Sequence, residues 1–170
     1  MNRGFTLLEL LIVIVVLAIM LSWSVPSYQS LTESSKMKRL ASELNGLMLL
    51  GKSQAVLQRR RLWAHVHMTG STSDDGQWRI ALTDDSAPGE GKVIQQIDGV
   101  AFRDIAVEVS YSSNQISFDD VHGRPSSGNI AFYPVGKPTH KLKLISHTQS
   151  ARIRVCSSNS RGPHYGFASC

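Results

Sequence analysis

The order of apolar and polar residues divides the chain into an apolar front, an amphipathic stretch and a remainder with strand-like alternation. Between Phe5 and Leu21, only Thr6 and Glu9 are not apolar. Because about 20 apolar helical residues cross a bilayer core, we expect a transmembrane helix over 5–25. A secretory signal peptide is the competing interpretation, but small residues of the A-x-A kind are absent at the end of the run.

A 3.6-residue repeat follows the apolar run and predicts that the same helix continues to about Gln58. The repeat places these residues on one stripe: Leu31, Met37, Leu40, Ala41, Leu44, Met48, Gly51 and Ala55. A stripe of this kind packs on a core, so we expect 26–58 to be an amphipathic continuation that lies on a globular domain. The basic cluster at 59–61 complements the negative end of the helix dipole or, alternatively, contacts nucleic acid.

From Leu62 onward the apolar residues alternate with period two, and turn-forming residues separate the alternating runs. The pattern predicts a β-rich globular domain over 59–170 and an α+β fold, in which one long N-terminal helix packs on a small antiparallel sheet domain. The expected strands are Leu62–Met68, Gln77–Thr83, Val100–Ser110, Gln115–Asp119, Asn129–Tyr133, Lys141–His147 and Ala151–Cys156. The edges near 93–98 are ambiguous.

The net charge of +5 hides an uneven distribution. Residues 62–120 contain three basic and ten acidic groups, a net charge of −7, whereas residues 121–170 contain seven basic groups and no acid. The second of these segments is a candidate for anionic partners.

The segment Gly4-Phe5-Thr6-Leu7-Leu8-Glu9-Leu10, followed by an apolar run, resembles the class III signal of type IV pilins and type II secretion pseudopilins. The resemblance implies that prepilin peptidase removes leader residues 1–4 by cutting between Gly4 and Phe5, and that Phe5 is then N-methylated. It also implies a single-pass protein of the bacterial inner membrane, with a cytoplasmic N-terminus and a periplasmic domain. After assembly, the chain would lie in a filament with other pilins or pseudopilins.

Glu9 is the single charged residue in the apolar run and is a candidate assembly residue. A carboxylate inside a membrane is costly and is by default functional. In an apolar bundle of helices, Glu9 of one subunit can pair with the Phe5 amine of a neighbour, which satisfies both charges on assembly. Pairing with the amine of the same chain is the alternative.

The second half resembles the GspH/FimT family of minor pilins and pseudopilins. The resemblance rests on the Trp78 strand, the turn Phe132-Tyr133-Pro134-x-Gly136, a basic hairpin and a final strand with Ala151-Arg152-Ile153-Arg154. The family often has Gly-Arg-x-Arg in that strand. The resemblance implies a FimT/FimU-like minor pilin of a type IV pilus, with a minor pseudopilin of a type II secretion system as the alternative.

The basic hairpin is a candidate DNA-binding surface. If the last two strands pair, strand alternation places Lys141, Lys143, Arg152 and Arg154 on one side, with Arg161 following. Such a stripe binds phosphates electrostatically, and similarity to FimT-like proteins links it to DNA capture in natural transformation. The alternative is that these cations contact the acidic segment 62–120 of the same or a neighbouring subunit.

Cys156 and Cys170 are the only cysteines in the sequence. In a domain outside the cytoplasm they are expected to form a disulfide, since the compartment is oxidising. No sequence signature of an enzyme is present, and His65 and His67 on one strand are a weak basis for a metal site. We therefore expect a structural subunit without catalytic activity, cofactor or metal.

Overall fold

The computed structural model describes residues 6–158 and 162–170, without the side chains of 22–27 and 29. The chain divides into two units, residues 1–35 and 36–170. Helix α1 (Leu7–Gln58) contributes to both. It ends at the residue predicted from the sequence. The backbone then turns through Arg59, which has a left-handed conformation (φ 50°), while Arg60 N donates to Ala55 O at 3.2 Å.

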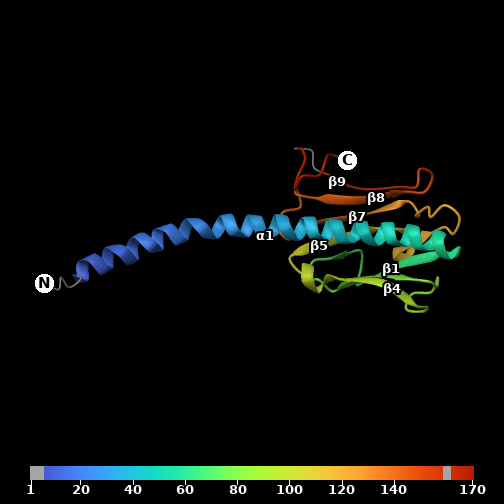
Figure 1. The fold of residues 1–170 in the computed structure, drawn as a ribbon, viewed down its shortest axis with the longest axis horizontal. Coiled ribbons are helices and arrows are strands. Elements are labelled where there is room, and N and C mark those ends of the chain that lie inside the picture. Colours follow the sequence, from blue (N-terminus) through green and yellow to red (C-terminus); the bar gives the residue numbers. More distant parts are fainter. Residues whose placement is uncertain (1–5, 159–161) are drawn as a thin grey trace. The chain divides into compact units, whose positions relative to one another are not determined.

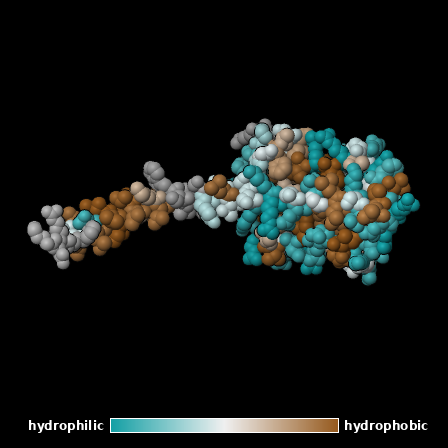
Figure 2. Space-filling view, viewed as in Figure 1, coloured by the Kyte–Doolittle hydropathy of each residue, from teal (hydrophilic) through white to brown (hydrophobic). Residues whose placement is uncertain are grey.

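In the first unit, α1 exposes apolar side chains in every direction. All described side chains from Leu7 to Leu21 are exposed, and among them only Glu9 is charged. Figure 2 shows the apolar covering of this part of the helix. The transmembrane prediction for 5–25 extends beyond the described side chains. Within the residues that the structure describes, no helix is both long enough and apolar enough to cross a membrane.

In the second unit, one face of α1 packs into a hydrophobic core. Met37, Leu40, Leu44, Met48 and Ala55 are all at most 1% exposed. They pack with strand residues such as Ile80, Phe118 and Phe132. The predicted stripe is thereby confirmed over 37–55. Leu47 is also buried, whereas Leu31 is 66% exposed and does not belong to the packed stripe.

The strands of the described residues form two antiparallel sheets. The four-stranded sheet has the order β4-β3-β1-β6 and the five-stranded sheet the order β2-β5-β7-β8-β9. In Figure 1, β7, β8 and β9 lie on one side of the second half of α1, and β1 and β4 lie on the other. The bounds are β1 Leu62–Met68, β2 Thr72–Ser73, β3 Trp78–Thr83, β4 Val93–Asp98, β5 Ile105–Ser110, β6 Gln115–Phe118, β7 Gly128–Pro134, β8 Leu142–His147 and β9 Arg152–Ser157.

The strand predictions were wrong at one long segment. The range Val100–Ser110 was expected to be one strand, but Gly99–Phe102 forms a 3₁₀ turn and β5 begins only at Ile105. Within this turn, the backbone at Gly99 approaches Gly76 O and the Trp78 ring so closely that a Cβ would lie within 2.6 Å of both, so a side chain larger than that of glycine does not fit. The short strand β2 was not predicted, and the ambiguous segment 93–98 is the edge strand β4.

Candidate functional site

At its N-terminal end, α1 presents Glu9 in its first turn. Thr6 caps this turn, because Glu9 N donates to Thr6 Oγ1 at 3.2 Å and Leu10 N donates to Thr6 O, also at 3.2 Å. The Glu9 side chain is exposed among apolar neighbours, near the positive end of the helix dipole. This arrangement leaves a carboxylate available to a cation of another chain. The predicted processing residues, Gly4 and Phe5, lie outside the described residues.

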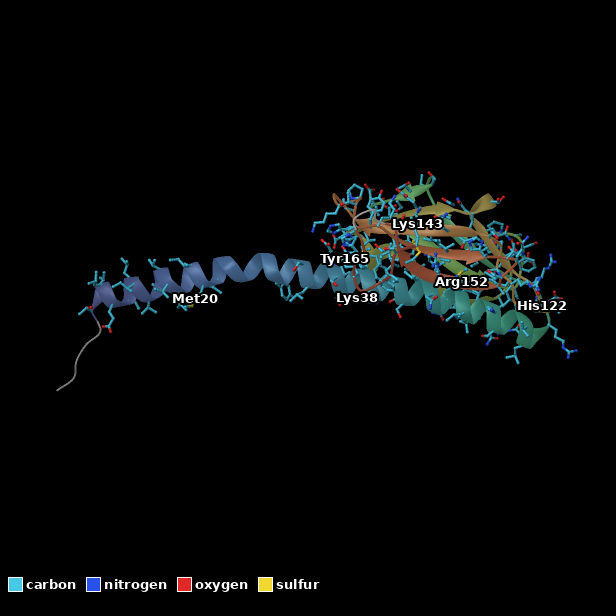
Figure 3. The ribbon with its side chains drawn as sticks, turned by 90° about the horizontal axis from the view of Figure 1, so that it is seen from above. Met20, Lys38, His122, Lys143, Arg152 and Tyr165 are labelled. Carbon is cyan, nitrogen blue, oxygen red and sulfur yellow. A yellow bond between two sulfur atoms is a disulfide. The ribbon has the colours of Figure 1, made fainter. Side chains whose placement is uncertain are left out.

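Strands β8 and β9 form the basic hairpin expected from the sequence. Their register places Lys143 opposite Cys156, Ile145 opposite Arg154 and His147 opposite Arg152. Directly opposed residues of an antiparallel pair point to the same face. Lys143, Arg152 and Arg154 therefore share one face, which we call the outer face, while Leu142 and Leu144 on the other face are fully buried. Figure 3 labels Lys143 and Arg152 on this hairpin.

The turn between the two strands is tight, and Ala151 is its left-handed residue. Ala151 has φ 49°, in the left-handed region where a glycine is favoured. Ala151 N donates to Thr148 O at 3.3 Å, and Lys52 Nζ of α1 donates to Ala151 O at 3.2 Å. The helix therefore holds the hairpin at its turn, and the tight turn is formed although alanine occupies the position.

Lys141 precedes β8 rather than opening it, and it already has an anionic partner. Its Nζ lies 2.8 Å from Glu108 Oε2 and 4.6 Å from the centre of the Tyr133 ring. Tyr133 Oη donates to Glu108 Oε1 at 2.8 Å. Burial raises the pKa of Glu108, but hydrogen bonds from Lys141 and Tyr133, with the charge of nearby Lys143, bring that pKa below its usual value. Sequence reasoning missed Glu108, which comes from β5 far away in the chain.

The remaining predicted cations differ in their surroundings. Arg152 is exposed, whereas Arg154 Nη2 donates to the carbonyl oxygen of Cys170 at 2.6 Å. Arg161 lies outside the described residues. The structure thus brings Lys143, Arg152 and Arg154 onto one face and lowers the net charge beside them through Glu108.

A disulfide joins Cys156 in β9 to Cys170, with 5.0 Å between their Cα atoms. The last residues also pair with the end of β9, since Ser157 N donates to Ala168 O and Cys170 N donates to Ser157 O. Together these bonds fix residues 168–170 against the five-stranded sheet.

The two histidines considered as metal ligands have different environments. His65 is 2% exposed, and its Nε2 lies 2.9 Å from Asp85 O. His67 is exposed, with its ring centre 6.3 Å from that of His65. Among the residues that the structure describes, no group of three His, Cys, Asp or Glu side chains is placed to hold a metal ion.

The long helix, the packed second half and the two small sheets define a type IV pilin-like protein. The prokaryotic N-terminal methylation motif matches residues 1–25. The family described as Type II transport protein GspH matches residues 40–164, and the chain belongs to this family. It is therefore a minor pilin or pseudopilin of the GspH/FimT kind, a class of filament subunit found in type IV pili and type II secretion systems.

Individual relatives agree with this assignment. The chain is 29% identical over 123 residues to a fimbrial protein of Pseudomonas aeruginosa, covering 72% of this chain and 75% of the relative. The fold resembles the type IV minor pilin FimU of P. aeruginosa, with a TM-score of 0.59 and 20% identity. The match covers 75% of this chain and 93% of the FimU chain. It also resembles the minor pseudopilin EpsH of the Vibrio cholerae type 2 secretion system, with a TM-score of 0.54 and 13% identity. This match covers 71% of this chain and 95% of the EpsH chain.

Proposed function

We propose that this chain is a minor pilin that is built into a type IV pilus through its N-terminal helix. The observation that carries the proposal is the apolar surface of α1 from Leu7 to Leu21, where every described side chain is exposed. An apolar surface of this extent is stable only when lipid or other helices cover it. Residues 5–25 would be held in the inner membrane before assembly, and neighbouring pilin helices would cover them in the filament.

Processing fits this route. Prepilin peptidase would cut between Gly4 and Phe5, and methylated Phe5 would begin the mature chain. Glu9 would then lie one helical turn from the new amine, where it can pair with Phe5 of a neighbouring subunit. The role of the folded domain is contact with partner subunits rather than catalysis.

The test compares Glu9→Ala with Glu9→Asp in cells that carry the remaining pilins. We expect Glu9→Ala to be processed and stably expressed but strongly depleted from sheared filaments, with partial recovery for Glu9→Asp. Normal recovery of Glu9→Ala would show that the carboxylate pairs within its own chain or has no role in assembly.

A pseudopilin of a type II secretion system is the alternative, and the family description favours it. The resemblance to a fimbrial protein favours the pilus. Deletion of the gene separates the two assignments. Loss of surface pili with normal secretion supports the minor pilin, whereas normal pili with exported enzymes trapped in the periplasm support the pseudopilin.

A second candidate function, DNA contact, is favoured by the common outer face of Lys143, Arg152 and Arg154. Phosphate contacts give weak, sequence-independent binding that falls with salt. In the full chain, Arg152→Gln with Arg154→Gln should reduce binding to random duplex DNA and flatten the salt slope by about two units. Lys92→Gln, which removes an exposed cation within the acidic segment 62–120, is the control. Unchanged binding of the double variant would exclude this face as a DNA site.

A further inference from the structure

The edge of β9 that points away from β8 has hydrogen-bonding partners at both of its ends. At one end, Ser157 bonds through both its N–H and its C=O to residues 168–170. At the other end, Lys52 Nζ of α1 donates to Ala151 O. Because the backbone groups of a strand point alternately to its two sides, the groups of Ile153 and Val155 point to this same edge.

Ile153 and Val155 lie between these two satisfied ends. Among residues 6–158 and 162–170, no hydrogen bond reaches the backbone groups that Ile153 and Val155 direct away from β8. Two N–H donors and two C=O acceptors are thus presented in the order that a further strand would require.

Beside this edge, α1 and β9 enclose a groove of about 380 Å³. Ile153, Val155 and Phe167 form its apolar lining, and each is only partly buried against the core. The helix contributes Lys38, Ala41, Ser42 and Asn45. Figure 3 shows β9 beside α1, with Lys38 and Arg152 labelled. An added strand would place alternate side chains over the apolar lining.

The charge at the groove has one sign. Lys38 and Arg154 line it, no lining residue is acidic, and exposed Arg152 follows on β9. Lys38 is exposed on α1. A strand added here would meet cations along its length and would be favoured if its own side chains were anionic.

We propose that α1 and β9 form a docking groove for an extended, acidic segment of a partner protein, which adds to the free edge of β9 as a strand. Strand addition uses backbone hydrogen bonds for affinity and side-chain pockets for selectivity. The alternation of donors and acceptors matches a polypeptide backbone and not a nucleic acid. The groove is distinct from the outer face considered for DNA, although Arg154 lines both and Arg152 of the outer face lies next to the groove on β9.

The test measures binding of a short fluorescent peptide of alternating Val and Glu to the full chain in detergent, by anisotropy. Val155→Pro removes the open N–H without removing a bond to β8, and Val155→Ala is its matched control. We expect Val155→Pro to bind about tenfold more weakly than Val155→Ala, the effect of one lost hydrogen bond.

A second pair of variants tests the charge. Lys38→Glu, inside the groove, should weaken peptide binding by about tenfold, whereas Lys143→Glu on the outer face should leave it within about twofold. If Val155→Pro does not fold, as judged by its far-ultraviolet circular dichroism and its Cys156–Cys170 bridge, the two lysine variants alone test whether the peptide binds in the groove.

The proposal would be overturned by no binding of the acidic peptide, by equal binding of a Val/Lys peptide, or by equal losses in Lys38→Glu and Lys143→Glu. Displacement of the peptide by oligothymidylate in the Lys143→Glu variant would also overturn it, since the groove would then accept nucleic acid.

Discussion

Lys141 donates a 2.8 Å hydrogen bond to Glu108, which lies two strands away in the five-stranded sheet. This bond links the basic C-terminal segment to the acidic middle segment within one molecule. The intramolecular alternative considered from the sequence is therefore realised for Lys141. On the outer face, Arg152 is exposed, whereas Lys143 and Arg154 are half-buried.

The first prediction concerns Glu108. Glu108→Gln should lower the free energy of unfolding at neutral pH by about 1 kcal/mol, since the charged hydrogen bond to Lys141 is partly exposed. The pKa of Glu108 is lower in the folded state. Its stabilisation is therefore present above the usual glutamate pKa and is lost as pH falls through the folded-state value. Urea titrations between neutral and acidic pH should show that the free energy of unfolding depends less on pH in Glu108→Gln than in the wild type. If Glu108→Gln keeps the wild-type pH dependence, Glu108 is not the stabilising carboxylate. Glu90→Gln, at an exposed position, is the control.

The second prediction concerns the buried pair of Tyr111 and Ser146, whose hydroxyls lie 2.7 Å apart. Ser146 Oγ donates to Ser126 O, so Tyr111 must donate to Ser146. Tyr111→Phe should cost about 1 kcal/mol in the free energy of unfolding, and chemical denaturation measures it. Tyr28→Phe, which alters an exposed side chain, should cost nothing measurable.

The same pair gives a pH dependence at high pH. Burial, which outweighs the hydrogen bond to Ser146, raises the pKa of Tyr111 to about 12. A raised pKa gives stability that is present below the unfolded value near 10 and is lost as pH rises toward the folded value. The free energy of unfolding of the wild type should fall between pH 10 and 12, and that of Tyr111→Phe should fall less. Parallel curves would show that another group governs alkaline unfolding.

The third prediction uses two glycines of α1 as a matched pair. A Cβ at Gly51 would lie 2.8 Å from the Phe118 ring, whereas a Cβ at Gly46 would meet nothing within 4 Å. Gly46→Ala should stabilise the fold by about 0.5–1 kcal/mol through helix propensity. Gly51→Ala should destabilise it by about 1–2 kcal/mol, because the clash outweighs the same gain. Equal thermal shifts for both variants would contradict the packing of Phe118 on α1.

Much of the fold follows from the sequence, because periodicity is a local signal. The end of α1, the buried stripe from Met37 to Ala55 and the bounds of β1 were predicted from it. Two features were not, because each depends on contacts between distant segments. The turn at Gly99 packs closely against Gly76 and Trp78, and the partner of Lys141 is set by the pairing of β5, β7 and β8. Alternation placed Arg152 and Arg154 on one face, but it could not show that Arg154 also binds Cys170 O.

The fourth prediction concerns the disulfide between Cys156 and Cys170. A bridge that closes a loop of about 15 residues contributes about 3 kcal/mol, largely by restricting the unfolded chain. Cys170→Ser should lower the melting temperature and increase hydrogen exchange from Ser157 onward, with little change in α1. Ser169→Ala is the control. Free thiols at both positions in non-reducing peptide mapping would contradict the bridge.

The central claim is that this chain is a processed pilin subunit of a filament, and mass spectrometry of purified filaments tests it most directly. Sheared pili from cells expressing the wild-type chain should contain it, and its N-terminal peptide should begin at Phe5 and carry one methyl group. Recovery of the chain only in membranes, or with an intact Met1, would contradict the claim.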